Sequence, residues 1–315
     1  MRDLRILFMG TPDFAVETLK TIIQNEYHVV GVITAPDRPA GRGRKLKASA
    51  VKEYALSKHI PILQPTNLKD ESFIAELKTL NANLQIVVAF RMLPKIVWDM
   101  PAYGTFNLHA SLLPDYRGAA PINWAIINGE KKTGITTFFI DEKIDTGHVI
   151  LQKEVVIENT DSAGELHDRL MTEGAGLVIE TLKAIENDAV VVTPQPNTQN
   201  LKTAYKLNKE NTKINWSEDM YTIHNLIRGL SPYPSSWCTL HNNNTSENVK
   251  IYDTIPIEEP HSLEIGKVVV EDATIKVAVK NGFIIVNKLQ LPGKKAMDSK
   301  ALLNGYVFYR DAKMS

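Results

Sequence analysis

Short apolar runs alternate with segments of helical periodicity from Leu4 to His109. The runs that we expect to form buried strands lie at 4–8, 29–33, 61–63, 84–90 and 105–109. Between the first two runs, apolar residues recur every three or four positions, and helices are also expected at 52–58 and 72–80. Strands that alternate with helices favour a mostly parallel, Rossmann-like α/β sheet with helices on both faces.

The same alternation predicts where the fold would bind a ligand. In open sheets of this kind, ligands bind beyond the carboxyl ends of the strands. The first helix should begin near GTPD, with Thr11 as its N-cap and Pro12 in its first turn. Two further strands, at 135–140 and 148–157, have no helix between them and are expected at the edge of the sheet. A long helix at 162–185 follows, with Asp161 or Ser162 as its cap.

The pattern changes after residue 190. The stretch TPQPNTQNLKTA contains two prolines and little apolar content, which is typical of a linker. Beyond it we expect one helix at 220–230 and short strands at 237–240, 249–252, 267–270, 274–279 and 283–289. Lys280-Asn281-Gly282 between the last two strands is a hairpin signal. We therefore predict three parts, which are an α/β domain at 1–190, a linker at 191–205 and a small OB-like β-barrel domain at 206–315.

Composition narrows the classes of protein to consider. Hydrophobic residues make up 43% of the 315 residues and charged residues 23%, as in an ordinary globular protein. The single cysteine, Cys238, excludes an intramolecular disulfide and a cysteine-based zinc site, and it favours a reducing compartment. No signal peptide and no run of about 20 apolar residues are evident, so we expect a cytoplasmic protein with no membrane partner. Because 36 basic residues balance 36 acidic ones, a phosphate-rich partner would need a local basic patch.

Polar side chains mark the end of the strand at 105–109. Asn107 and His109 are two residues apart, so in a strand both point to the same side of the sheet. An amide donor and an imidazole that exchanges protons near neutral pH could act together on a carbonyl group. An isolated pair of this kind is more often an ordinary polar strand end. The apolar loop Ser111-Leu112-Leu113-Pro114 follows, and it suits either simple packing or the wall of a slot for a flat ligand.

A distant carboxylate can complete this group. Asp145 precedes Thr146 and Gly147, which is a common turn sequence. In the functional interpretation, Asp145 lies near His109, orients its ring and stabilises its protonated form. His148 is close by, but no cluster of further ligands accompanies it, and we expect no metal site.

Basic residues are concentrated in one short segment of this otherwise neutral chain. Residues 36–47 carry one acid, Asp37, against five basic residues, which are Arg38, Arg42, Arg44, Lys45 and Lys47. Two glycines and two prolines argue against a helix. The segment is either a solvated loop or an arm that orders on a phosphate backbone. The P-loop pattern and the dinucleotide fingerprint GxGxxG are both absent.

Taken together, these motifs are similar to those of the formyltransferase family that uses 10-formyltetrahydrofolate. The family pattern of Asn-x-His, then SLLP, then a distant Asp-x-Gly occurs here in order as Asn107/His109, 111–114 and Asp145/Gly147. Other matching stretches are GTPDFA, PDRPAGRGRKL, HASLLPDYRGAAPI, INW at 214–216, IRGLSPYPSSW at 227–237 and LQLPGKKA at 289–296. The resemblance thus covers nearly the whole chain.

The resemblance implies that a formyl group is transferred from 10-formyltetrahydrofolate to the α-amine of methionine on initiator tRNA. It assigns Asn107 and protonated His109 to the developing oxyanion, and Asp145 to the imidazolium and the amine proton. The resemblance assigns folate binding to Ser111, Leu112, Leu113 and Pro114. It assigns contact with tRNA to Arg42 first, and also to Arg38, Arg44, Lys45 and Lys47.

Other acceptors are open within the same family. Glycinamide ribonucleotide formyltransferases, sugar-nucleotide formyltransferases and formylfolate hydrolases share the Asn, His and Asp pattern. Residues 206–315 hold 14 Lys and Arg against 12 Asp and Glu, so any RNA-binding face in the C-terminal part must be a patch, for example at Lys294 and Lys295. We expect the protein to be a monomer.

Overall fold

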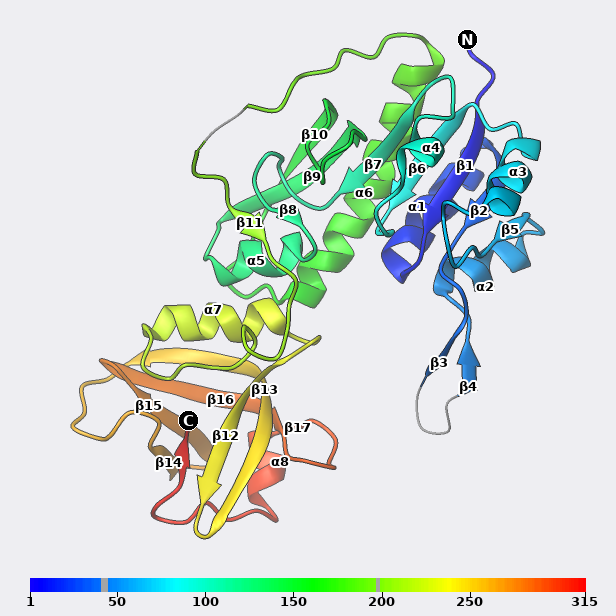
Figure 1. Ribbon diagram of the computed structural model, residues 1–315. Helices are drawn as coiled ribbons and strands as arrows, with labels where there is room; N and C mark the ends of the chain where they lie inside the picture. Colours follow the sequence, from blue (N-terminus) through cyan, green and yellow to red (C-terminus); the bar gives the residue numbers. More distant parts are fainter. Residues whose placement is uncertain (41–44, 197–198) are drawn as a thin grey trace. The chain divides into compact units, whose positions relative to one another are not determined.

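The computed structural model describes residues 1–40, 45–196 and 199–315, and of Ala40 and Lys45 only the backbone. The chain divides into two compact units that do not follow chain order (Figure 1). The first unit comprises residues 1–118, 133–156 and 167–203, and the second comprises residues 119–132, 157–166 and 204–315. Two short segments that precede the long helix in the sequence therefore pack with the C-terminal part of the chain.

A seven-stranded sheet forms the centre of the first unit, in the order β10-β9-β7-β6-β1-β2-β5. Five of its strands are parallel, and β9 pairs antiparallel with β7. The strands are β1 (Arg5–Gly10), β2 (His28–Ile33), β5 (Ile62–Leu63), β6 (Leu84–Val88), β7 (Thr105–His109), β9 (Lys132–Phe139) and β10 (Val149–Val156). The expected mostly parallel sheet is confirmed, and the β9–β10 pair lies at its edge.

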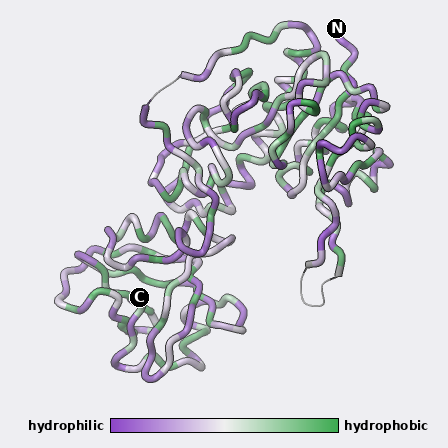
Figure 2. Tube along the Cα trace, viewed as in Figure 1, coloured by the Kyte–Doolittle hydropathy of each residue, from purple (hydrophilic) through white to green (hydrophobic). Residues whose placement is uncertain are grey.

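Helices cover both faces of this sheet. They are α1 (Asp13–Gln24), α2 (Ala50–Ser57), α3 (Glu71–Thr79), α4 (Lys95–Trp98) and α6 (Ala163–Glu186). Helices α3 and α4 bury Phe73, Ile74, Leu77 and Val97 in one cluster with Leu7, Met9, Ile33 and Val87 of the sheet. On the opposite face, Gly174 of α6 lies directly against Leu108 of β7, and the Thr181 hydroxyl of α6 bonds to that of Thr137 at 2.8 Å. Figure 2 shows hydrophobic residues along the strands between these helices.

Helix starts follow local capping chemistry. Ser49 and Asp70 cap α2 and α3 by accepting backbone N–H groups of the first turn. At α6, Ser162 and Glu165 form a reciprocal capping box, which supports one of the two expected caps. The expected N-cap Thr11 is wrong by one residue, because Pro12 occupies the cap position of α1 without a side-chain cap.

The basic segment forms a short antiparallel hairpin of β3 (Arg38–Ala40) and β4 (Lys45–Lys47). The absence of a helix was expected, but the strand pairing was not. Leu46 is 73% exposed, so cross-strand backbone pairing rather than core burial stabilises the hairpin. The hairpin sequence therefore lacks the alternation of apolar and polar residues that predicts a half-buried strand.

A curled antiparallel sheet forms the centre of the second unit, in the order β14-β15-β16-β13-β12-β18, with β17 beside β16. Hydrogen bonds from Val268 to Ala312 and from Met314 to Gly266 join its two edges. This arrangement is the expected OB-like barrel. The strands are β12 (Ser236–Asn242), β13 (Thr245–Glu258), β14 (Val268–Glu271), β15 (Thr274–Val279), β16 (Gly282–Gln290), β17 (Met297–Asp298) and β18 (Lys313–Met314).

Three helices complete the second unit, namely α5 (Pro121–Ile127), α7 (Met220–Leu230) and α8 (Ser299–Leu303). Helix α7 buries Met220, Ile223 and Ile227 in the barrel core. Helix α5 packs on α7, where the Asn123 amide donates to the Gly229 carbonyl at 2.7 Å. The remaining short strands are β8 (Arg117–Gly118) and β11 (Thr203–Ala204). In the described part of the chain, no helix has the length and apolar character needed to cross a membrane.

Candidate active site

Strand β7 places Asn107 and His109 on the same face of the sheet. Asn107 pairs in register with Phe138 of β9 and with Val87 of β6, and Val87 belongs to the face that packs on α3 and α4. His109 is 7% exposed at the carboxyl end of the strand. The Asn107 side chain is partly exposed, and among the described residues it has no hydrogen-bond partner. Its amide is therefore available to a ligand at this edge of the sheet.

A backbone carbonyl fixes the His109 ring. Its Nε2 atom lies 2.8 Å from the carbonyl oxygen of Tyr116. A carbonyl oxygen only accepts, so Nε2 carries a proton and donates it. Tyr116 has φ 60°, a left-handed conformation that is uncommon for a bulky residue. The second ring nitrogen, Nδ1, is left to face the site.

Asp145 lies opposite that nitrogen. Its Oδ2 atom is 3.9 Å from Nδ1 of His109 and accepts the Gly118 N–H at 2.9 Å. The distance to His109 exceeds a direct hydrogen bond, but catalytic contacts are often loose without substrate. Asp145 has φ 55°, and a Cβ on Gly147 would lie 1.6 Å from the Phe139 carbonyl oxygen. Residue 147 must therefore be a glycine, because the turn after Asp145 brings the backbone against the end of β9.

Two residues that the sequence analysis missed hold the same turn. The Gln195 amide donates to the carbonyl oxygens of Asp145 at 3.0 Å and Gly147 at 2.8 Å. Its oxygen accepts from Arg117 Nε at 3.1 Å and Nη2 at 2.6 Å. Arg117 lies in the DYRG stretch and Gln195 in the supposed linker, and no periodicity connects them.

The loop 111–114 is a closely bonded turn. The Ser111 hydroxyl donates to the Asp115 carbonyl, and the Leu113 N–H donates to Thr136. The Leu113 carbonyl accepts from Gln152. Ser111 and Leu113 are buried, whereas Leu112 and Pro114 are partly exposed. The polar groups of Ser111 and Leu113 are thus used within the protein, and the loop offers the site a shaped wall.

The predicted basic residues are only partly described. Arg38 and Lys47 face each other in the hairpin register and are exposed. Arg42 and Arg44 lie outside the described residues, as does the side chain of Lys45. Hydrogen bonds from Lys52 and Gln64 hold the pKa of Asp37, the one acid of the segment, below its usual range. Asp37 is therefore ionised and engaged at the base of the hairpin, away from the paired basic residues.

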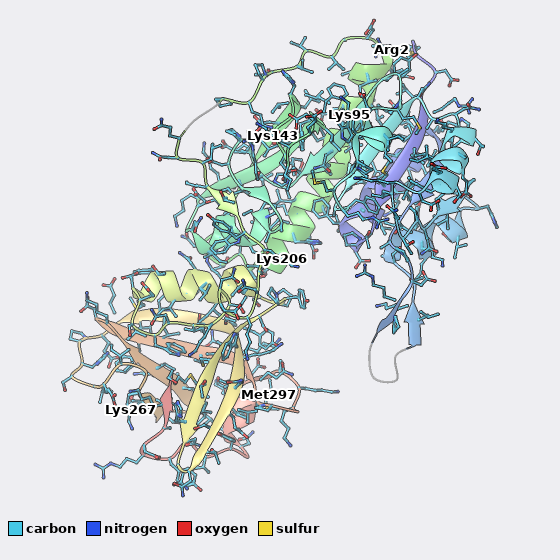
Figure 3. The ribbon with its side chains drawn as sticks, viewed as in Figure 1. Arg2, Lys95, Lys143, Lys206, Lys267 and Met297 are labelled. Carbon is cyan, nitrogen blue, oxygen red and sulfur yellow. The ribbon has the colours of Figure 1, made fainter. Side chains whose placement is uncertain are left out.

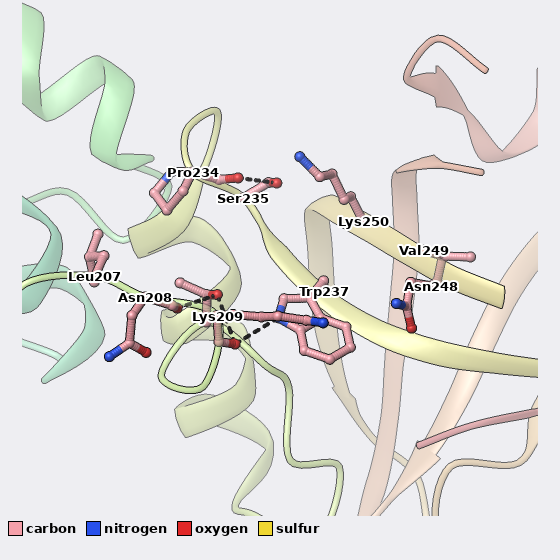
Figure 4. A pocket seen from close by; sticks show the side chains of 10 residues that line it. Leu207, Asn208, Lys209, Pro234, Ser235, Trp237, Asn248, Val249 and Lys250 are labelled. Carbon is pink, nitrogen blue, oxygen red and sulfur yellow. Dashed lines mark hydrogen bonds between the residues drawn. The ribbon is translucent and has the colours of Figure 1, made fainter. Parts of the chain in front are cut away.

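A groove in the second unit combines lysines with an aromatic ring (Figure 4). It has a volume of about 440 Å³. Trp237 of β12 pairs with Lys250 of β13, and its ring has Lys209 Nζ at 5.2 Å and Lys213 Nζ at 5.6 Å from its centre. These three lysines are exposed and have no carboxylate partner among the described residues. The expected patch at Lys294 and Lys295 is also exposed, but among the described residues neither lysine lies over an aromatic ring.

Metal chemistry has no obvious site in the described part of the chain. No three His, Cys, Asp or Glu side chains gather there as ligands would.

Comparisons with known proteins identify the family. Residues 4–182 match the family model described as formyl transferase, and residues 206–307 match formyl transferase, C-terminal domain. The chain is 64% identical over 314 residues to methionyl-tRNA formyltransferase of Flavobacterium johnsoniae, covering all of both chains. It is 52% identical to methionyl-tRNA formyltransferase of Bacteroides thetaiotaomicron, with 99% of each chain covered.

Solved structures share the fold at lower identity. WlaRD, a sugar 3N-formyl transferase solved in the presence of dTDP and 5-N-formyl-THF, is 23% identical with a TM-score of 0.66, over 94% of this chain and all of that one. HypX from Aquifex aeolicus, in complex with tetrahydrofolic acid, is 17% identical with a TM-score of 0.65, over 96% of this chain and 47% of that one. By the two family matches and the full-length relatives, this chain belongs to the formyl transferase family.

Proposed function

We propose that this protein transfers the formyl group of 10-formyltetrahydrofolate to the α-amino group of methionine on initiator tRNA. The observation that supports the proposal is the position of Asn107 and His109 on one face of β7, with Asp145 Oδ2 3.9 Å from Nδ1 of His109. The full-length relatives that are named methionyl-tRNA formyltransferases support the choice of acceptor.

Each of the three side chains has a distinct task. The attack of an uncharged amine on the formyl carbon places negative charge on the formyl oxygen. When this tetrahedral intermediate collapses, the bond from the formyl carbon to N10 breaks, and N10 takes up a proton as tetrahydrofolate leaves. The unpartnered Asn107 amide and the Nδ1–H of protonated His109 stabilise this charge. Asp145 lies on the Nδ1 side of the ring, where it stabilises the imidazolium and takes part in removing the amine proton, directly or through water. No covalent intermediate is needed, because the Ser111 hydroxyl is bonded within its own turn.

The surroundings of β7 fit a flat, anionic co-substrate. The loops after β6 and β9, the strands that flank β7, expose Met92 at 67% and Ile144 at 61%. Lys95, the first residue of α4, pairs with Glu142 of the loop after β9 at 3.6 Å, and the next residue of that loop, Lys143, is exposed. Figure 3 labels both lysines. Apolar side chains suit the folate ring system and lysines suit its carboxylates. Residues 111–114 form the remaining wall in this proposal.

Basic groups on each unit would hold the tRNA. Of the basic residues at 36–47, Arg42 is our first choice for contact with the acceptor end, followed by Arg38, Arg44, Lys45 and Lys47. In the second unit, the groove at Trp237 offers three lysines for phosphates and an aromatic edge for a base. We favour this groove over Lys294 and Lys295 because charge and aromatic surface coincide there.

The remaining assignments follow from this substrate. A protein that formylates initiator tRNA works in the cytoplasm, where translation begins. We propose that it acts as a monomer. We also propose a catalytic domain at 1–190, a connecting segment at 191–205 and a tRNA-binding domain at 206–315.

Acceptor choice tests the function. Purified protein is given 10-formyltetrahydrofolate with Met-tRNA, glycinamide ribonucleotide, an amino-sugar nucleotide or water alone, and the formylated product is quantified. We expect formyl-methionyl-tRNA as the main product. Preferential formylation of another acceptor, or simple hydrolysis at the same rate, would overturn the proposal in favour of one of the related activities.

A further inference from the structure

The connecting segment is bonded to the wall of the candidate active site. We call residues 193–196 and 199–202 the strap. At its start, Thr193 exchanges two backbone hydrogen bonds with Val149, both 2.8 Å long. At its end, the Lys202 N–H donates to Asp115 Oδ1 at 3.1 Å. The strap thus lies along the first unit from β10 to the loop that follows β7.

Gln195 of the strap ties the Asp145 turn to strand β8. Its amide nitrogen reaches the carbonyl oxygens at both ends of the Asp145–Gly147 turn. Its amide oxygen accepts two N–H groups of Arg117, so the orientation of the amide follows from its partners. The residue after Arg117, Gly118, donates to the Asp145 carboxylate itself. Asp145 is therefore bonded to β8 in two ways. Its backbone carbonyl is linked to Arg117 through Gln195, and its carboxylate accepts directly from the Gly118 N–H.

The strap also holds the second partner of His109. The Tyr116 N–H donates to the Lys202 carbonyl at 2.6 Å, and the Tyr116 carbonyl accepts from His109 Nε2. Tyr116 and Asp145 both adopt left-handed backbone conformations, which require support from their neighbours. The two groups that face the two nitrogens of the His109 ring are thus both anchored by the strap.

We propose that Gln195 is a positioning residue for formyl transfer, and that the strap sets the geometry of the His109–Asp145 pair. This inference rests on the proposed function of that pair. Reactions that depend on oriented groups lose about 100-fold in rate when a group is misplaced by about 1 Å. Removing the Gln195 amide frees the Asp145 turn without removing any side chain that we assign to contact with substrate.

Steady-state kinetics of the full chain test the proposal. We expect Gln195→Ala to lower kcat about 10- to 100-fold, with the KM values for tRNA and folate changed less than about threefold. Gln195→Glu should lose as much, because a carboxylate still accepts from Arg117 but cannot donate to the two carbonyls. Gln199→Ala is the matched control. It lies in the same strap, is exposed, and has no partner among the described residues.

A double-mutant cycle separates positioning from a general loss of structure. If Gln195 acts through Asp145, adding Gln195→Ala to Asp145→Asn should cost less than about twofold more in single-turnover rate. Melting temperatures check folding, and Gln195→Glu takes the place of Gln195→Ala if the latter does not fold. Wild-type kcat in Gln195→Glu, or fully multiplicative losses in the cycle, would overturn the proposal. Failure of the wild-type protein to formylate Met-tRNA would instead overturn the proposed function.

Discussion

His109 is held by a hydrogen bond on one ring nitrogen and faces a carboxylate across an open gap on the other. The bond to the Tyr116 carbonyl determines which nitrogen carries its proton in the neutral ring. The 3.9 Å separation from Asp145 leaves room for a reacting group or a water to approach Nδ1. Asn107, unpartnered on the same face, completes a set of donors for an oxygen that gains charge.

Removing either donor should slow the chemical step. We expect Asn107→Ala and His109→Ala each to lower kcat by about 10²- to 10³-fold, as loss of one oxyanion donor does in acyl transfer. His28→Ala is a suitable control, because His28 is exposed at the amino end of β2, whereas His109 lies at the carboxyl end of β7. Single-turnover formylation of Met-tRNA measures the effect. Full turnover in both variants would refute the assigned roles.

Cys238 should be chemically silent in the folded protein. Burial raises the pKa of its thiol to about 12, outweighing the influence of the nearby Trp216 indole and the charge of Lys213, and its side chain is fully buried in the barrel core. Because the thiolate is the reactive form, we expect no alkylation by iodoacetamide at pH 8 until the barrel unfolds. Mass spectrometry of labelled native and denatured protein measures this. Rapid labelling of the native protein would show that the barrel opens.

At the scale of elements, the β3–β4 hairpin carries charge without a hydrophobic anchor. Its described side chains, including Leu46, are exposed, and contact with a partner is the role that we propose for it. The concentration of charge in the sequence is the basis for that role. Strand pairing could not be predicted, because none of the described hairpin side chains is buried.

Loss of hairpin charge should weaken tRNA use selectively. We expect Arg42→Ala, and likewise the double variant Arg38→Ala with Lys47→Ala, to raise KM for Met-tRNA. Each lost phosphate contact should lower the slope of log affinity against log salt by about 1. Turnover with a minimal amine acceptor should change far less. Lys78→Ala on α3 is the control, since Lys78 is an exposed lysine outside the hairpin. Equal losses on both acceptors would indicate a structural role.

At the scale of the whole molecule, the sequence predicted the two architectures, whereas the grouping of segments into compact units depends on contacts that no sequence pattern displays. In the strands and helices of both units, buried positions recur with the period of the element. The sequence shows the same period as a pattern of apolar residues, so these elements could be predicted. The grouping of α5 and residues 157–166 with the C-terminal part depends on single contacts, such as Arg228 with the Glu158 and Asp161 carbonyls. Gln195 and Asp145 are likewise joined by a hydrogen bond across 50 residues. Such contacts have no periodic signature, so the sequence could nominate Asn107, His109 and Asp145 as candidates but could not predict which residues bond to them.

Acid should destabilise the protein through His224 of α7. Burial, aided by the charge of Arg228 and opposed by Asp253, lowers its pKa from 6.5 to about 4. Between these values the unfolded chain binds a proton that the folded chain does not, so the free energy of unfolding falls as pH drops through this window. The full effect is up to about 3 kcal/mol. His224→Gln should flatten the loss between pH 6.5 and pH 4 relative to wild type. Identical pH profiles in denaturant titrations would contradict this.

The central claim is that Asn107, His109 and Asp145 surround the point where the formyl group is transferred. A crystal structure of the protein with a non-reactive analogue of 10-formyltetrahydrofolate tests this most directly. The account predicts that N10 and its one-carbon substituent lie within about 4 Å of the Asn107 amide and His109 Nδ1, with Asp145 in direct or water-mediated reach. An analogue whose N10 lies more than about 8 Å from all three side chains would contradict it.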